Sequence, residues 1–287
     1  MSKTRPVLES PIACQNRTLE KRSTMSSFET ITLQLEQGLA TLTLNRPDQA
    51  NAMNPLMAKE LSDAATRLAE QSDLRCVLIR STGKLFCAGG DIAEFAEAGQ
   101  EVGRLIRTMA GDLHIAISRL TRLDAPVVCA VQGTAAGAGL SLCVAADLAI
   151  AVDTAKFTSA YTKAGLSPDG SSTYFLPRRI GDRKARELML TNRVLSAEEA
   201  VSWGLINQAV PAESFESAVA QCVGEVMSGP TRAFGSVKRL LNESSHTSLE
   251  TQMELETREI ASCAVGEDGQ EGIQAFLAKR APNFKGR

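Results

Sequence analysis

The strongest constraint on the fold is a series of short, fully apolar segments in the first half of the chain. Residues 76–79 read CVLI, residues 127–131 read VVCAV and residues 148–152 read LAIAV. Segments of this length and composition are typical of strands that are covered on both faces of a sheet. Residues 54–68 and 101–122, which lie between them, carry apolar side chains at helical spacing. Strands that alternate with helices in this way predict an α/β fold.

The last third of the chain follows a different pattern. No strand-like segment is found after residue 180, and Ser196-Ala197-Glu198-Glu199 has the form of a capping box that opens a helix. Further helices are predicted at residues 183–190, 211–227, 230–241 and 249–263, and an early hairpin at residues 31–44. We therefore expect an N-terminal tail without fixed structure at residues 1–27, an α/β core at residues 28–210 and a C-terminal helical region at residues 211–287.

The first 24 residues are rich in basic, hydroxyl and proline side chains and lack an apolar stretch. The missing apolar stretch argues against a secretory signal. Met25 precedes the first strand-like segment. Three interpretations stay open: a disordered tail, an upstream start codon that is not used, and an organellar transit peptide.

The overall composition excludes several classes of protein. Lys and Arg number 31 against 33 Asp and Glu, so nucleic acid and anionic membranes are not expected as partners. The longest apolar runs are far shorter than the roughly 20 residues that span a bilayer. With two histidines, and with seven cysteines that form no CxxC pair, no metal site is expected. Cysteines within apolar stretches are typical of reduced, buried thiols, so we expect a cytoplasmic protein.

Two glycine-bearing turns follow two of the apolar segments. They read FCAGGD at residues 86–91 and GTAAGAG at residues 133–139. Glycine and alanine let the backbone approach a ligand closely, and a helix that begins after such a turn offers free N–H groups. The second turn does not match the G-x-G-x-x-G dinucleotide motif, and no P-loop motif is present. The turns therefore indicate either an oxyanion hole or tight packing of small residues.

Two polar residues stand out elsewhere. Asp169 lies in a Pro-Asp-Gly turn before a helical stretch, and His114 lies within an amphipathic helix. Taken alone, Asp169 is typical of a turn or a helix cap, and His114 of an ordinary surface or core histidine. Each becomes a candidate catalytic group only together with the glycine turns.

Taken together, these segments resemble the crotonase family, the enoyl-CoA hydratase/isomerase superfamily. The resemblance covers about residues 28–287 and is carried by residues 42–47 (LTLNRP), 86–91, 126–139, 195–205 and 271–277 (EGIQAFL). It implies a spiral of ββα units with a C-terminal helical trimerisation region, in a homotrimer or hexamer. It also implies an acyl-CoA thioester as substrate and no separate cofactor.

The resemblance assigns roles to particular residues. The N–H groups of Gly90 and Ala138 would form the oxyanion hole for the thioester carbonyl as it becomes an enolate. Coenzyme A would lie along residues 50–51 and the Ala88 turn. It would also meet residues at the C-terminal end, often across a subunit boundary. The full set of implied coenzyme A contacts is Ala50, Asn51, Ala88, Phe276 and Lys279.

The same resemblance bears on the reaction. Hydratases of the family use two glutamates, and this sequence has Ser141 and Tyr161 at the matching positions. Asp169 matches the single acid of the Δ3,Δ2-enoyl-CoA isomerases, which removes a proton and returns it two carbons away. We therefore expect an enoyl-CoA isomerase, with an enoyl-CoA hydratase or another crotonase activity as an alternative.

Two further alternatives remain. The 4-chlorobenzoyl-CoA dehalogenases have an aspartate nucleophile and a histidine at the positions of Asp169 and His114. They also have Trp at the position of Tyr161 and an aromatic residue at that of Gly90. The second alternative is a crotonase-fold subunit that binds without catalysis.

Overall fold

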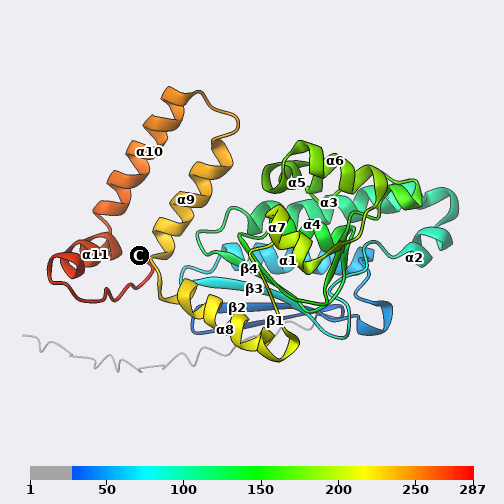
Figure 1. Cartoon of the computed structure of the whole chain (residues 1–287), viewed down its shortest axis with the longest axis horizontal. Helices are drawn as coiled ribbons and strands as arrows, with labels where there is room; N and C mark the ends of the chain where they lie inside the picture. The colour runs from blue at the N-terminus through cyan, green and yellow to red at the C-terminus, as the bar shows by residue number, and fades with distance from the viewer. Residues whose placement is uncertain (1–27) are drawn as a thin grey trace, which may run out of the picture.

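The computed structural model describes residues 28–287 of the 287-residue chain (Figure 1). The expected N-terminal tail at residues 1–27 lies outside the described residues. The main sheet has the order β1-β2-β3-β4-β6-β9, with β1 antiparallel to β2 and every later pair parallel. Its strands are β1 (Ile31–Glu36), β2 (Leu39–Leu44), β3 (Cys76–Ser81), β4 (Val127–Val131), β6 (Leu148–Val152) and β9 (Gln208–Val210). The predicted α/β fold is confirmed.

A second, smaller sheet lies beside the site described below. It has the order β5-β7-β8 and consists of β5 (Ala135–Ala136), β7 (Lys156–Thr158) and β8 (Leu195–Ser196). The prediction that no strand follows residue 180 is wrong, because β8 and β9 both occur there. These strands are two and three residues long, too short to show either an alternating or a continuous apolar run.

Helices cover the sheets. They are α1 (Pro55–Ala69), α2 (Ile92–Glu97), α3 (Val102–Leu120), α4 (Ala138–Ala145), α5 (Ser172–Ile180), α6 (Asp182–Thr191), α7 (Ala197–Trp203) and α8 (Ala212–Ser228). Asn54 begins α1 by accepting a hydrogen bond from the Met57 N–H at 2.9 Å, and Ser196 and Glu199 form the predicted capping box of α7. Helices α1 and α3 bury their apolar faces in the core, which also contains β2, β3 and β4.

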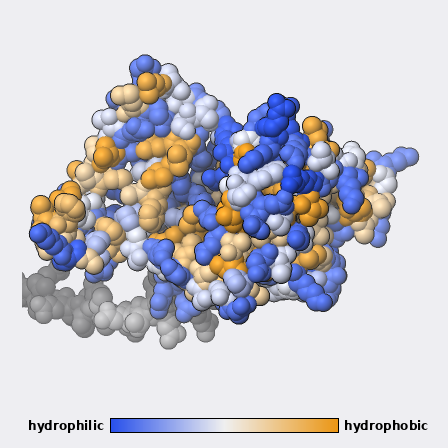
Figure 2. All heavy atoms as spheres, in the orientation of Figure 1, coloured by the Kyte–Doolittle hydropathy of each residue, from blue (hydrophilic) through white to orange (hydrophobic). Residues whose placement is uncertain are grey.

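Three helices extend away from this core. They are α9 (Thr231–Glu243), α10 (Leu249–Ala264) and α11 (Glu267–Leu277), and Figure 1 shows them on the opposite side of the molecule from α2. The first two match the predicted helices, and α11 is additional. Large apolar side chains are exposed along them, among them Leu241, Leu249, Ile260, Val265 and Phe276 (Figure 2). We call α9–α11 the C-terminal arm.

Candidate active site

Both glycine turns open onto one cavity of about 330 Å³, whose wall is mostly apolar. Gly90 comes from the first turn, Ala138 from the second, and Met109 and Leu113 of α3 from the opposite side. The turns are joined directly, because the Ala136 N–H donates to the Cys87 carbonyl at 2.9 Å. The structure therefore brings together two segments that lie about 50 residues apart in the sequence.

The Gly90 N–H is directed by the pairing of its neighbours. The Met53 N–H donates to the Gly89 carbonyl at 2.7 Å, and the Asp91 N–H donates to the Met53 carbonyl at 2.8 Å. Successive peptide groups of an extended segment point to opposite sides. The Gly90 N–H therefore points away from Met53 and takes no part in this pairing.

The Ala138 N–H is directed by a hydrogen bond on the other side of its peptide group. The Gly137 carbonyl accepts from the Ser141 N–H at 3.0 Å within the first turn of α4. Carbonyl and N–H of one trans peptide point in opposite directions, so the Ala138 N–H faces away from α4. As the first residue of the helix, Ala138 has no intrahelical acceptor. Gly137 has a φ of 50° and a ψ of −120°, which favours glycine at this position.

Small residues are required where the two turns meet. A Cβ atom at Gly139 would lie 2.6 Å from the Cys87 backbone oxygen. The packing of small residues is therefore real, and it also holds two N–H groups beside one cavity. Two such donors can stabilise a negative oxygen, each by roughly 3–4 kcal/mol in a transition state.

The loop of residues 50–51 lies against the first glycine turn. The Ala88 N–H donates to the Ala50 carbonyl at 3.1 Å. Asn51 is fully buried, and its side chain bonds three backbone groups: the Arg46 N–H and the carbonyls of Thr82 and Leu85. Any contact of Asn51 with a ligand would therefore use its backbone.

An ion pair that the sequence reasoning missed supports the same loop. The Arg46 guanidinium lies 3.1 Å from the Asp91 carboxylate and donates to the Ala52 carbonyl at 2.6 Å. Asp91 also caps α2, where it accepts from the Glu94 N–H. Both residues lie in segments that carry the family resemblance, and this was the available signal.

Asp169 is the one carboxylate among the residues that line the 330 Å³ cavity within the described chain. The Tyr161 hydroxyl donates to Asp169 Oδ1 at 2.7 Å. Burial, followed by the charge of Asp169, raises the pKa of Tyr161 well above its ordinary value, so the phenol stays protonated and remains a donor. The Ser141 Oγ lies 3.0 Å from the same phenol oxygen and 3.1 Å from the Asp169 carbonyl.

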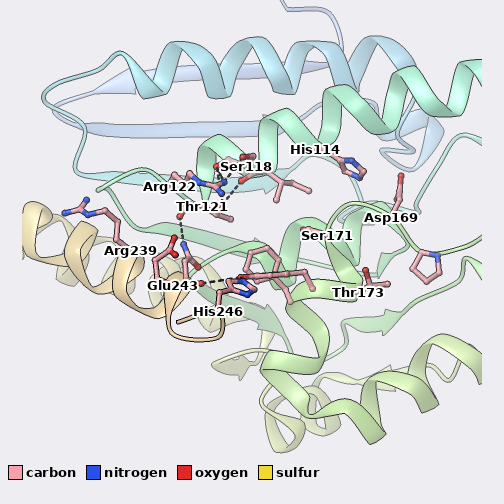
Figure 3. A pocket seen from close by; sticks show the side chains of 15 residues that line it. His114, Ser118, Thr121, Arg122, Asp169, Ser171, Thr173, Arg239, Glu243 and His246 are labelled. Carbon is pink, nitrogen blue, oxygen red and sulfur yellow. Dashed lines mark hydrogen bonds between the residues drawn. The ribbon is translucent and has the colours of Figure 1, made fainter. Parts of the chain in front are cut away.

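His114 lies beside the Asp169 turn, on the edge of a second, more polar cavity of about 840 Å³ (Figure 3). Asp169 lines this cavity too. The His114 Nε2 accepts from the Gly170 N–H at 3.1 Å. An Nε2 that accepts a hydrogen bond carries no proton, so this imidazole has its proton on Nδ1. His114 therefore supports the turn through Nε2.

Phe276 and Lys279 lie apart from these residues. Neither lines the 330 Å³ cavity, and Phe276, in α11, is 83% exposed. Within one chain the structure thus brings Gly90, Ala138, Asp169 and Ala88 to one cavity and His114 next to it, and leaves the two C-terminal residues on the arm.

Two searches of residues 28–287 complete the description of the site. They contain no group of three His, Cys, Asp or Glu side chains that could hold a metal ion. No helix in this part of the chain is long and apolar enough to cross a membrane.

A spiral α/β core with two backbone N–H groups and one carboxylate at a single cavity is an arrangement suited to enolate chemistry on an acyl thioester. Comparison with known proteins identifies the family. The model of the family "Enoyl-CoA hydratase/isomerase" matches residues 34–287, and the chain belongs to this family, the crotonases. It is an acyl-CoA-processing enzyme.

Relatives with three different activities are similar to this chain. The 1,2-epoxyphenylacetyl-CoA isomerase of Escherichia coli is 36% identical over 91% of this chain and 100% of its own length. The 4-chlorobenzoyl coenzyme A dehalogenase-2 of an Arthrobacter species is 32% identical over 87% of this chain and 91% of its own. The crystal structure of an enoyl-CoA hydratase from Polaromonas sp. JS666 superimposes with a TM-score of 0.83, at 31% identity over 88% of this chain and 99% of that one.

Proposed function

We propose that this enzyme is a Δ3,Δ2-enoyl-CoA isomerase in which Asp169 is the single acid–base group. The observation that carries the proposal is the cavity with one carboxylate beside two backbone N–H groups. An isomerisation removes and returns one proton, so one carboxylate suffices.

The reaction proceeds in two balanced steps. The Asp169 carboxylate removes a proton from C2 of a 3-enoyl-CoA, and the electron pair moves into the conjugated dienolate. The negative thioester oxygen accepts hydrogen bonds from the N–H groups of Gly90 and Ala138. The protonated Asp169 then donates the proton to C4, and the double bond forms between C2 and C3. The product is an isomer of the substrate, so no water or oxidant is consumed.

Hydration is less well supported. Addition of water needs a second group to activate it, and hydratases of the family use a second glutamate there. In this chain the two matching positions are Ser141 and Tyr161. A buried phenol with a raised pKa cannot act as a base near neutral pH.

The dehalogenase alternative is also less well supported. It requires a histidine that activates water for hydrolysis of an aryl ester. Here the His114 Nε2 already accepts from the Gly170 N–H, and Tyr161 donates to one oxygen of Asp169. Both contacts favour a carboxylate that is held as a base.

The test is an assay of a 3-enoyl-CoA and, in parallel, a 2-enoyl-CoA, with the wild type, Asp169→Asn and the control Asp153→Asn. Asp153 is an exposed acid at the end of β6. We expect turnover of the 3-enoyl substrate to fall at least about 10²–10⁴-fold in Asp169→Asn alone. Undiminished isomerisation in that variant would remove Asp169 from the mechanism, and hydration that survives in it would identify a hydratase with another base.

We also propose that the enzyme is a homotrimer or hexamer in which Phe276 and Lys279 contact coenzyme A bound to a neighbouring subunit. The apolar side chains exposed on the C-terminal arm support this. The six free cysteines of the described residues support a reducing, cytoplasmic location.

A further inference from the structure

Two hydroxyl groups connect the candidate base to the candidate oxyanion hole. The Ser141 Oγ lies 3.2 Å from the Gly137 carbonyl, 3.1 Å from the Asp169 carbonyl and 3.0 Å from the Tyr161 phenol oxygen. The Tyr161 phenol in turn donates to Asp169 Oδ1 at 2.7 Å. A continuous set of hydrogen-bonding groups therefore runs from the second glycine turn to the carboxylate.

One end of this set controls the Ala138 N–H. The Gly137 carbonyl and the Ala138 N–H belong to the same peptide group, so a partner that holds the carbonyl also fixes the direction of the N–H. Ser141 holds this carbonyl through its backbone N–H at 3.0 Å and has its Oγ within 3.2 Å. Ser141 is fully buried, so water does not compete for these bonds.

The other end controls Asp169. Tyr161 occupies Oδ1 and leaves Oδ2 as the oxygen free to receive a proton from the substrate. Ser141 reaches the Asp169 backbone carbonyl, and the Ser172 hydroxyl donates to the same carbonyl at 2.8 Å. A cavity wall built in this way allows little movement of the carboxylate toward or away from Ala138.

We propose that Ser141 and Tyr161 are positioning residues that hold the Asp169 carboxylate and the Ala138 N–H in one geometry, so that both act on the same thioester. The proposal rests on the proposed function, because it requires Asp169 to be the base. Neither hydroxyl exchanges a proton with the substrate in this scheme. Their effect is to fix orientation, which is worth a large part of a catalytic rate when the reacting groups must align.

The pH dependence separates this role from simple packing. Tyr161 donates to the charged form of Asp169, so its removal should make the carboxylate harder to ionise. Other titratable groups face the same turn: His114 from α3, Arg107 and Lys163 around the 330 Å³ cavity, and Arg122, Arg239, Glu243 and His246 across the larger one. None of these is altered by a change of Tyr161 to Phe.

The chain offers a matched control. Ser159 is fully buried and lies two residues before Tyr161, and its Oγ has no hydrogen-bond partner among the described residues. Ser159→Ala therefore removes a buried hydroxyl from the same segment without breaking a bond. Its activity should stay within about twofold of the wild type.

The experiment measures kcat, KM and the pH profile of 3-enoyl-CoA isomerisation for Tyr161→Phe, Ser141→Ala, the double variant, Ser159→Ala and Asp169→Asn. We expect Tyr161→Phe to lower kcat about 10–100-fold with KM within about twofold, as for a lost hydrogen bond to a charged group. The acidic limb of its profile should move up by about 1 pH unit. Ser141→Ala should lower kcat about 2–10-fold and leave the limb in place. The double variant should lose less than the product of the two single losses.

The outcomes are distinguishable. If Tyr161→Phe behaves like Ser159→Ala, or loses rate without a shift of the acidic limb, the positioning role is wrong while the proposed function stands. If Asp169→Asn keeps its activity, the proposed function itself fails. Should Tyr161→Phe not fold, Ser141→Ala decides the question through its kcat at unchanged KM, and a rate equal to that of Ser159→Ala would overturn the proposal.

Discussion

The α/β core and the C-terminal arm treat their apolar residues in opposite ways. In the core, the faces of α1, α3 and the central strands are covered. On α9–α11, side chains such as Ile260 and Phe276 are 72% and 83% exposed. The groups proposed for chemistry lie in the covered region, whereas two of the implied coenzyme A contacts lie in the exposed one. The comparison indicates that bond rearrangement needs one chain and that full substrate binding needs an assembly.

The largest effect should come from disturbing the covered region where the two glycine turns meet. Gly139→Ala would place a Cβ atom 2.6 Å from the Cys87 backbone oxygen, so the turns must separate. We expect a loss of about 1–3 kcal/mol in the free energy of unfolding. We also expect at least about a 100-fold fall in kcat, since the N–H donors are displaced.

Thermal melting and isomerase kinetics measure both effects. Gly103→Ala on α3 is the control, because nothing lies within 4 Å of the added Cβ atom there. Equal behaviour of the two variants would show that close contact between the turns does not matter for the chemistry.

The exposed region makes the next prediction, which concerns assembly. Ile260→Asp places a charge on an apolar surface of α10, and a charge is costly to bury in an interface. We expect the mass measured by light scattering to fall from a multiple of 30.6 kDa to that of one chain, with the circular dichroism of the core retained. A wild-type protein that is already monomeric would contradict the proposed oligomer.

Phe276→Ala should have a smaller effect that joins the two regions. Loss of one large apolar contact with the ligand is worth about 1.5–3 kcal/mol. We therefore expect the KM for the acyl-CoA to rise roughly tenfold or more, with kcat nearly unchanged. Leu277→Ala, which alters the next exposed residue of α11, is the control. A fall in kcat without a rise in KM would argue against a binding role for Phe276.

The sequence reasoning succeeded where the signal is local. The Asn54–Pro55 start of α1 and the Ser196–Glu199 capping box depend on residues that are neighbours in the chain, and both are present. The strands β8 and β9 were missed, because pairing with distant strands defines such short segments. Pattern alone also marked the glycine turns, whose joining by the Ala136 N–H and the Cys87 carbonyl required the folded chain.

The polar contacts of the candidate site were beyond prediction for the same reason. Tyr161 and Ser141 were noted only as positions without a carboxylate. Their bonds to Asp169 bridge 8 and 28 residues, and the bond from Gly170 to His114 bridges 56. No periodicity in a sequence encodes distances of that kind, because they depend on how α3, α4 and the α5 loop pack.

The smallest predicted effect lies on the arm and concerns pH. Glu271 accepts hydrogen bonds from Arg280, which together with the Asn283 N–H lowers the pKa of Glu271 to about 2. A carboxyl group whose pKa is lower in the folded state stabilises the fold above its unfolded pKa near 4.3, and this contribution is lost as the pH falls toward 2. Glu271→Gln should therefore lower the melting temperature slightly at pH 7, and the difference from the wild type should shrink between about pH 4.5 and pH 2. Because the pair is exposed to solvent, salt should also reduce the difference. Glu256→Gln, an exposed position on α10, should show neither trend, and a Glu271→Gln difference that grows on acidification would reverse the assigned sign.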